Sequence, residues 1–528
     1  MERIILKSKL FLKFKTLKNL IQLSSEDKQF CSYSSGKWNE QPQDTEGELL
    51  LDLMDYDHYI FQQSYIANFF RLNYKLEPVY YHFIAREKVL LRLFFSLFRK
   101  FSRLDKLYKS FNCSFALSQK KHKYSKELAN KLKFKTKHDL LDFHYEGIKI
   151  GDLIYDTYLR TYARPTVDLE DERLEKIIVN TFDIYFTCKD YLDNHNVKKI
   201  VNSHAVYIQC AILGRLALLR GIDVYNFSWD RVLHKLSIDH HLPTPRHLEY
   251  KKSFAEKKNK DDLRGEAKRR LEGRLRGEID PGIAYMKTSP YSDSNDSKKI
   301  FLDNGKPKVV MMLHCFYDAP HIYKDCLFED FNEWVEFIFS RVEEMNVDLV
   351  VKPHPSPKPL NSVILEKLFT KYPNIRVLDK NTSNKKIIEE GVDLLLSVYG
   401  TVAHEFAYQG VKVLLGGDNP CAAYDFCKLP KNKKEFEYYL MNIEEISLDL
   451  NKKEIEEFFY MHFINDSGDR GTVTSIDGNT DLFHGFTRNY DPLNKEIFLE
   501  LVRDGNSGTF DNMFPSWQKA LNEVDSYV

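Results

Sequence analysis

The sequence predicts an α/β fold built on a doubly wound parallel sheet, and three observations support this prediction. The chain has 528 residues, of which 43% are hydrophobic, so it is long enough to bury more than one core. Five short apolar segments between residues 308 and 415 alternate with segments of helical periodicity. A separate strand–helix–strand pattern covers residues 198–227, which indicates a further pair of parallel strands upstream.

The amino-terminal part is predicted to be helical after a polar start. Residues 1–45 are basic and then polar, a composition that predicts a tail without packed structure. Residues 46–135 are expected to be helical and rich in aromatic side chains. Within them, Val89–Phe101 has apolar positions at helical spacing and predicts a core helix, with a membrane-surface helix as the alternative. The strand–helix–strand unit at 198–227 follows, and Gly221 ends its helix.

A composition change near residue 290 marks the expected domain boundary. Residues 251–277 form a mixed-charge helical stretch, which we interpret as a solvated face. The turn-rich segment Ser289–Ser297 follows it. We therefore expect one domain over residues 46–295 and a second over residues 300–480.

The second domain shows the most regular alternation. Strands are expected at residues 308–313, 347–352, 375–378, 393–396 and 411–415, with helices at 328–344, 362–371, 385–390 and 402–409. Doubly wound sheets bind ligands beyond the carboxyl ends of their strands. The residues that follow each strand are therefore the first candidates for a site.

Two of these strand ends suggest phosphate binding. The strand at 347–352 ends in Lys352-Pro353-His354-Pro355, where the two prolines restrict the backbone on both sides of the imidazole. A donating histidine beside a lysine suits a phosphate, and a simple turn with a solvent-facing histidine is the alternative.

The second phosphate signal is Ser397-Val-Tyr-Gly400-Thr401, which stands between a strand and a helix. Gly400 permits a tight turn, and Thr401 at the helix start indicates an anion site at the first turn of the helix, with an ordinary cap as the alternative. Glu405 lies one turn further on, where it is expected to accept hydrogen bonds from ribose hydroxyls unless it is solvated. Because both strand ends lie at one edge of the sheet, we expect His354 and Thr401 to face a shared gap.

The same segments resemble a known group of enzymes. The run His314–Pro320, the Lys352–Pro355 loop and the Ser397–Thr401 turn are similar to the carboxy-terminal half of bacterial capsule and surface-polysaccharide biosynthesis glycosyltransferases of GT-B fold. The match covers about residues 300–430. Upstream, Gly147–Arg160 and Val201–His204 are also similar to them.

The resemblance implies a fold, a donor site and a domain crossing. A GT-B fold has two Rossmann-like domains facing a central cleft, here with a helical N-terminal extension, and residues 485–528 would form helices that pack back on the first domain. The resemblance also implies that nucleotide phosphates are held by His354, with Pro355 in its motif, and by Ser397 and Thr401. Lys352 is expected to help.

The catalytic base is expected in the first domain, because enzymes of this fold usually place it there. Asp152 and Asp156 are four residues apart and would share one helix face, with ion-paired or capping roles as the alternative. His204 follows the strand at 198–203 and is an equal candidate, unless it is a core or solvated histidine. His314 and Asp318 follow the first strand of the second domain and are expected to contact the transferred group, or to form a plain polar loop.

Composition and missing motifs exclude several classes of protein. The 77 basic and 77 acidic residues balance, which argues against a nucleic-acid partner. The eight cysteines lack zinc-site spacing, and the chain has no P-loop, GxGxxG or GxSxG motif. Asp55-Tyr-Asp57 has the spacing of a metal-binding motif without its strand context. We expect no metal and no cofactor besides a nucleotide-sugar co-substrate.

The function expected from the sequence is glycosyl transfer from a nucleotide-activated donor, CMP-linked as the first candidate. The acceptor would be a glycan or lipid-linked glycan of a bacterial surface polysaccharide. A CDP-polyol phosphotransferase of teichoic-acid type and a non-catalytic export or scaffold protein are the alternatives. No signal-peptide core or apolar span is present, which predicts a cytoplasmic protein. Its basic start, with Arg3 and five lysines, suggests contact with the inner face of the membrane as an alternative to a solvated tail.

Overall fold

The computed structural model describes most of the two predicted domains. It covers residues 20–39, 44–55, 57–84, 99–227, 232–242, 246–279, 289–292, 298–322, 326–354, 361–465 and 473–474. The expected helices within 485–528, most of Val89–Phe101 and Pro355 lie outside the described residues.

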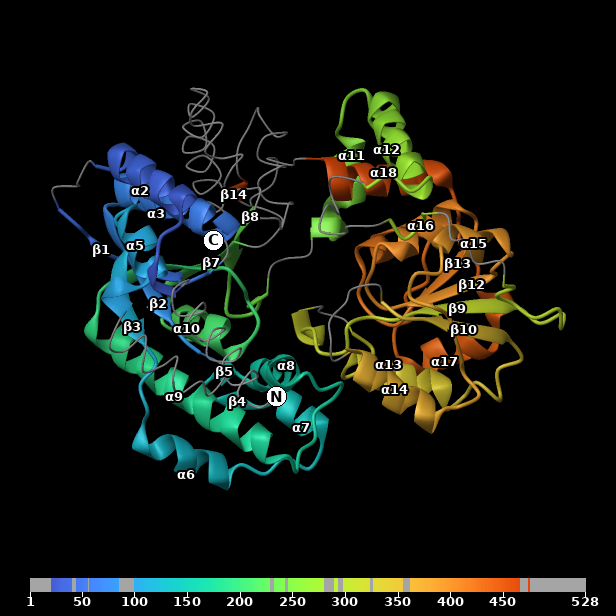
Figure 1. Cartoon of the computed structure of the whole chain (residues 1–528), viewed down its shortest axis with the longest axis horizontal. Helices are drawn as coiled ribbons and strands as arrows, with labels where there is room; N and C mark the ends of the chain where they lie inside the picture. The colour runs from blue at the N-terminus through green and yellow to red at the C-terminus, as the bar shows by residue number, and fades with distance from the viewer. Residues whose placement is uncertain are drawn as a thin grey trace, which may run out of the picture.

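The first domain contains a seven-stranded sheet with the order β14-β8-β7-β6-β1-β2-β3 (Figure 1). Its strands are β1 (Gly47–Asp52), β2 (Leu76–His82), β3 (Ser114–Ser118), β6 (Val197–Asn202), β7 (Asp223–Phe227), β8 (Val232–Leu236) and β14 (Val473–Thr474). The pairs from β3 to β7 are parallel, and β8 and β14 are added antiparallel at one edge. The predicted strand–helix–strand unit is confirmed as β6, α10 (Ile208–Leu219) and β7.

The prediction that residues 46–135 are helical is confirmed for Asp57–Tyr74, Arg103–Lys109 and Lys123–Lys131, but it misses the three strands β1, β2 and β3. The last four residues of β1 are all buried, since helices cover both faces of the sheet. A strand buried on both faces shows no alternation of apolar and polar residues, so its sequence cannot be told from a short piece of core helix.

Helices cover the first sheet on both faces. One face carries α2 (Ser25–Lys37), α3 (Asp57–Tyr74) and α5 (Arg103–Lys109), and the other carries α8 (Gly151–Tyr162), α9 (Glu172–Asn194) and α10. Two shorter helices, α6 (Lys123–Lys131) and α7 (Lys137–Leu141), and the hairpin of β4 (His144–Tyr145) and β5 (Ile148–Lys149) complete this side.

The polar start of the chain is more ordered than its composition predicts. Ser24 and Asp27 form a capping box at the start of α2, which satisfies backbone N–H groups at the helix end. Phe30 and Trp38 are buried in the core that α2 shares with α3 and α5. The expectation of an unpacked tail is therefore wrong for residues 25–37.

The second sheet confirms all five predicted strands and has the order β11-β10-β9-β12-β13, parallel throughout. The strands are β9 (Lys308–Met312), β10 (Asp348–Lys352), β11 (Arg376–Val377), β12 (Leu394–Ser397) and β13 (Lys412–Leu415). One face is covered by α13 (Phe331–Phe339), α14 (Asn361–Lys371) and α17 (Lys433–Met441), and the other by α15 (Asn384–Glu389), α16 (Val402–Tyr408) and α18 (Lys452–Phe459).

Two helices expected in the first domain pack with the second. These are α11 (Tyr250–Ala255) and α12 (Lys260–Leu275), which lie against α18 (Figure 1). Phe254, Ala267 and Leu271 are buried in the same core as α16 and β13. The segment interpreted as a solvated face is therefore half buried, and the change of core occurs between β8 and α11 rather than near residue 295.

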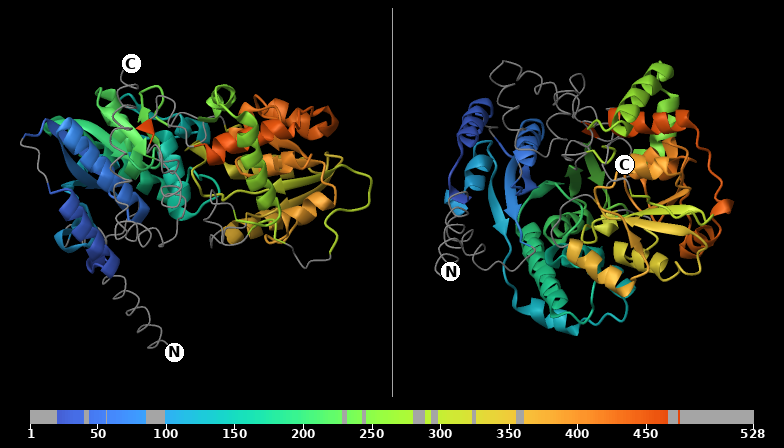
Figure 2. Two further views of the ribbon diagram at one scale, coloured as in Figure 1. Left: turned by 90° about the horizontal axis from the view of Figure 1, so that it is seen from above. Right: turned by 45° about the vertical axis from the view of Figure 1, so that its right-hand side comes forward.

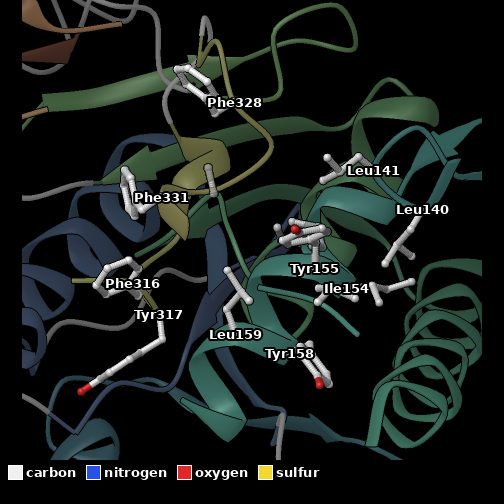
Figure 3. Packing of buried hydrophobic residues seen from close by; sticks show 14 of the residues in the cluster. Leu140, Leu141, Ile154, Tyr155, Tyr158, Leu159, Phe316, Tyr317, Phe328 and Phe331 are labelled. Atoms are coloured by element: carbon white, nitrogen blue, oxygen red, sulfur yellow. The ribbon is translucent and has the colours of Figure 1, made fainter. Parts of the chain in front are cut away.

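The two sheets share a topological rule and meet at one side. In each sheet, the first strand lies in the middle, and the chain first adds strands on one side of it and then on the other. β1 lies between β2 and β6, and β9 lies between β10 and β12. The loop after β9 contacts α8, and Figure 3 shows Phe316 and Tyr317 of that loop on the side of α8 that carries Leu159. Two doubly wound domains side by side, seen also in Figure 2, are the GT-B arrangement that the sequence predicts. Within the described residues, every helix is too short or too polar to cross a membrane.

Candidate functional site

The second sheet brings three predicted site segments to one edge. His314 follows β9, His354 follows β10, and the Ser397–Thr401 turn follows β12. These three strands are neighbours in the sheet, and the order of connection reverses between β9 and β12. Ligands of doubly wound sheets bind at this reversal, so the three segments define the candidate donor site.

His314 ties two of these segments together. Its Nε2 accepts a hydrogen bond of 2.9 Å from the backbone N–H of Tyr399, and its ring stacks on Phe331 with 4.9 Å between centroids. Burial, with a smaller contribution from the neighbouring His354, lowers the pKa of His314 to about 3, although Asp318 opposes the shift. His314 is therefore neutral at pH 7, with its proton on Nδ1, where it can donate to a ligand.

A buried ionic cluster lies behind the turn, formed by Arg274 of α12, Glu405 of α16 and Lys352 of β10. Arg274 is 1% exposed, and its Nη2 lies 2.7 Å from the Thr401 Oγ1 and 2.5 Å from Glu405 Oε1. The Tyr291 hydroxyl donates to Glu405 Oε2 at 2.7 Å. The sequence pattern does not reveal Arg274 as a site residue, because its stretch of mixed charge is typical of a solvent-exposed helix.

Lys352 and Glu405 both lie beneath the turn instead of at its surface. The Lys352 Nζ donates to the Asn384 side chain, and burial lowers the pKa of Lys352 to about 8, although Glu405 and Asp379 oppose the shift. Glu405 is completely buried, with Arg274 and Tyr291 as partners. This placement favours supporting roles for both residues over the direct phosphate and ribose contacts that the sequence suggests.

The cluster carries an excess of positive charge and hydrogen-bond donors. It contains two cations, Arg274 and Lys352, and one carboxylate, Glu405. Arg274 Nε and Nη1 and the Ser397 Oγ are buried without a hydrogen-bond partner among the described residues, and the one acceptor in the same position, Glu405 Oε1, is ion-paired with Arg274 Nη2. Buried donors without partners are rare in folded proteins. Their position under the loop ends at the sheet reversal favours an anion at this site.

The turn itself is shaped differently from the prediction. Thr401 occupies the N-cap position of α16, but its side chain makes no cap hydrogen bond and accepts from Arg274 instead. Gly400 does not have a left-handed backbone, and a Cβ there would meet Ser397 and His314 at ordinary distances of 3.8 and 3.9 Å. Arg274 therefore does more to define this turn than the glycine or a threonine cap.

The predicted carboxylates of the first domain are held in separate ion pairs. Asp152 makes a bidentate pair with Arg215, with both N–O distances 2.7 Å. Burial opposes ionisation of Asp152, but Arg215 outweighs it and keeps the pKa below its ordinary value. Asp156 pairs with His321 of the second domain at 2.6 Å. Both aspartates start from α8 as predicted, and this pairing favours the structural alternative over a catalytic base.

Asp318 lies where the two domains approach each other. Its carboxylate is 3.4 Å from the guanidinium of Arg160 on α8, and both side chains are about half exposed. The same carboxylate and that of Asp156 raise the pKa of Tyr207, in addition to the larger effect of burial. The loop after β6 and the loop after β9 are therefore neighbours.

His204 belongs to a chain of polar groups at the reversal point of the first sheet. The Ser203 Oγ lies 2.8 Å from His204 Nδ1 and donates a hydrogen bond to Asp52 Oδ2. The Ser203 N–H also lies 3.0 Å from each oxygen of Asp52. Asp52 is the last residue of β1. The sequence prediction omits it because it assigns no strand to β1, although an aspartate directly after Leu49–Leu51 is a usable signal.

Asp52, His204 and Cys210 also offer three ligand atoms within 4.8 Å of one another. Such a donor set suits a transition metal. Both Asp52 oxygens already accept hydrogen bonds from Ser203, so the arrangement favours a hydrogen-bonded chain over a metal site.

Comparisons of this sequence with known families and curated proteins find no match. Among solved structures, the beta Kdo 2,7 transferase of Thermosulfurimonas dismutans KpsC is 15% identical, covering 52% of this chain and 79% of its own, with a TM-score of 0.27. UDP-GlcNAc 2-epimerase from Neisseria meningitidis is 8% identical, with coverages of 78% and 97% and a TM-score of 0.20. A glycosyltransferase from Rickettsia africae is 9% identical, with coverages of 79% and 94% and a TM-score of 0.23. At these TM-scores, any functional conclusion depends on the geometry of the site.

Proposed function

We propose that this protein is a glycosyltransferase that moves a sugar from a nucleotide-activated donor, CMP-linked as the first candidate, to an acceptor in bacterial surface-polysaccharide synthesis. One observation carries the proposal: the loops after β9, β10 and β12 converge above a buried cluster with excess positive charge. The hydrogen bond from Tyr399 to His314 joins two of these loops, and the Leu313 N–H donates to the Lys352 carbonyl at 3.0 Å, which joins the end of β10 to the start of the loop after β9.

The chemistry of the convergent groups suits a leaving nucleotide phosphate. As the bond from the anomeric carbon to the phosphate oxygen breaks, negative charge grows on the phosphate. We expect His354, His314 through Nδ1–H and the Thr401 hydroxyl to donate to it, and Arg274 and Lys352 to stabilise the charge from beneath. Because the donors are held before the reaction, the enzyme does not have to reorganise them during it.

Nucleotide binding tests this proposal directly. Isothermal titration of the full chain with CMP, CDP and UDP is expected to show binding, with CMP or CDP tightest. His354→Ala should weaken the best ligand about 10- to 150-fold, since a charge-assisted hydrogen bond contributes about 1.5–3 kcal/mol. It should also abolish turnover in a folded protein. His138→Ala, an exposed histidine on α7, is the control and should leave affinity unchanged.

The outcomes separate this proposal from its alternatives. Absence of binding by all three nucleotides would contradict it and favour a non-catalytic scaffold. If CDP-polyols but no CMP-sugars are consumed, and the phosphate remains in the acceptor, the protein is a phosphotransferase. Near-normal activity of His354→Ala would remove His354 from the site.

A further inference from the structure

A second cluster of polar side chains lies at the reversal point of the first sheet. It contains none of the residues of the candidate donor site. It consists of Asp52 at the end of β1 and of Ser203 and His204, which directly follow β6. Asp52 and Ser203 are buried, whereas His204 is partly exposed. This cluster therefore leads from the interior to an accessible imidazole.

The hydrogen bonds of this chain determine where His204 carries its proton. An ionised carboxylate can only accept, so the Ser203 hydroxyl must direct its hydrogen to Asp52. The Ser203 oxygen then presents only lone pairs to His204 Nδ1, 2.8 Å away, and Nδ1 must be the protonated nitrogen. Nε2 is then the nitrogen without a proton, and its lone pair is the basic site of the ring.

The loop that carries His204 is held rigidly. Asp52 accepts from Ser203 at one end, and the Ile208 N–H donates to the Thr157 hydroxyl of α8 at the other, at 3.0 Å. Between them, Tyr207 has a φ of 66° and a ψ of 145°, a conformation that a residue with a side chain rarely adopts. Backbone strain of this kind persists only where the surroundings impose it, and it clusters at functional sites.

The loop also faces the donor site. At the end of the His204 loop, the Ile208 N–H donates to the Thr157 hydroxyl of α8, and Arg160 of the same helix lies 3.4 Å from Asp318 in the loop after β9. The loops that carry His204 and His314 therefore both contact the same part of α8, and Asp318 also raises the pKa of Tyr207. An acceptor held by the first domain would lie between them.

We propose that His204 is the catalytic base for the acceptor hydroxyl, and that Ser203 and Asp52 are positioning residues that hold it in the Nδ1–H tautomer. The inference rests on the proposed function. In the step, the acceptor oxygen forms a bond to the anomeric carbon and the carbon–phosphate-oxygen bond breaks. The bonding electrons leave with the nucleotide phosphate, and the acceptor proton moves to His204 Nε2.

The hydrogen-bonded chain of Asp52, Ser203 and His204 also makes the reaction rate depend on pH. Burial raises the pKa of Asp52 to about 6, although hydrogen bonds from Ser203 and Gln63 oppose the shift. Besides His204, the titratable groups that face Asp52 are Tyr81 of β2, Tyr108 of α5 and Cys210 of α10, and burial keeps these three protonated near neutral pH. Below about pH 6 the protonated Asp52 can donate to Ser203, which removes the constraint on the tautomer, and the rate should fall.

Imidazole nitrogen NMR tests the tautomer without any need for turnover. In the full chain with ¹⁵N-labelled histidine, the resonances lost in His204→Gln identify His204, and at pH 8 they should show a protonated Nδ1. Ser203→Ala should abolish this preference, whereas Ser125→Ala, a buried serine on α6, should not change it. A protonated Nε2 in the wild type would overturn the proposal.

Kinetics test the catalytic role. CMP release from a CMP-activated acidic sugar, in the presence of capsular oligosaccharide fragments, should fall about 100- to 10,000-fold in kcat for His204→Gln, a loss typical of a missing general base. Ser203→Ala should fall less, and CMP affinity should stay within about twofold in both. Unchanged kcat in His204→Gln with an active wild type contradicts this inference alone. Inactivity of the wild type with every donor contradicts the proposed function. The NMR experiment still decides whether Asp52 and Ser203 hold His204 in the Nδ1–H tautomer.

Discussion

At the scale of single residues, the buried pair of Arg274 and Glu405 links stability to the donor site. Both side chains are almost completely buried, and Arg274 also holds the Thr401 hydroxyl. Removing one member of a buried ion pair leaves the other charge without compensation. Arg274 is therefore both a support for the Ser397–Thr401 turn and a source of positive charge beneath it.

Single substitutions of this pair should destabilise the protein strongly. We expect Glu405→Gln and Arg274→Met each to lower the free energy of unfolding by about 3–5 kcal/mol, measured by urea denaturation followed by circular dichroism. The double variant Arg274→Met/Glu405→Leu should lose much less than the sum, because it removes both charges together.

An exposed ion pair provides the matched control. Lys251 and Asp425 lie 2.9 Å apart with side chains 43% and 78% exposed. Lys251→Met should change the free energy of unfolding by less than about 1 kcal/mol. Strict additivity in the Arg274 and Glu405 double variant would show that the two charges do not compensate each other.

At the scale of secondary-structure elements, the sequence predicts the second sheet well and the first sheet poorly. Strands such as β10 and β12 stand between clear helices and end at marked turns, so the positions of His354 and Ser397 at their carboxyl ends follow from the sequence. β1 and β2 are short apolar runs near long helices and carry no distinguishing period. Because β1 is not predicted, Asp52 at its end is not recognised as a site residue either.

Long-range contacts explain the other omission at this scale. Residues 260–275 look like a solvated helix because most of their side chains are charged. Only the packing of α12 against α18 shows that one face is buried and that Arg274 reaches Thr401, which is 127 positions away in the sequence. No local pattern contains that information.

The start of α8 provides a test of element packing. Gly151 is the first residue of α8, and a Cβ there would overlap the Leu140 carbonyl oxygen and lie 2.9 Å from that of Leu141. Backbone atoms of α7 cannot move aside cheaply, so Gly151→Ala should cost about 1–3 kcal/mol in the free energy of unfolding.

A glycine in an open position gives the opposite expectation. Gly265, in α12, is exposed, and a Cβ added to it would have no other atom within 4 Å among the described residues. Gly265→Ala should raise the free energy of unfolding by about 0.5–1 kcal/mol, since alanine restricts the unfolded chain and favours helix. Equal effects of the two substitutions in urea denaturation would contradict close packing at Gly151.

At the scale of the whole molecule, a buried histidine–aspartate pair joins the two domains. His321, in the short helix η4 (Pro320–Ile322) after β9, contacts Asp156 of α8 at 2.6 Å, and its Nε2 is buried without a hydrogen-bond partner among the described residues. Burial alone would lower the pKa of His321, but Asp156, with smaller effects from Asp152 and Asp330, raises it above 6.5. Burial also raises the pKa of Asp156 above 3.8, although His321 opposes this shift.

These shifts predict that the contact between the domains weakens as the pH rises. A histidine whose pKa is raised on folding contributes stability that is complete below its unfolded pKa of about 6.5 and is lost as the pH rises through the higher folded value. Asp156 acts in the same direction, because the folded state binds its proton more readily than the unfolded chain does. Its contribution is lost as the pH rises from about 3.8 through its own folded value.

Hydrogen exchange can measure this weakening at the contact itself. Between about pH 6 and pH 9, peptides from α8 and from residues 313–322 should lose protection in the wild type, after correction for the intrinsic exchange rate at each pH. In His321→Gln the protection should be lower at the acidic end and should change little with pH, whereas the exposed-surface variant His138→Gln should follow the wild type. A wild type whose protection is constant over this range, or a His321→Gln variant with the same slope, would show that the pair does not control the approach of the two domains. Because the His204 loop and the donor site face each other across that approach, weakening of the pair at high pH would separate the proposed base from the donor even while the base itself stays in its active form.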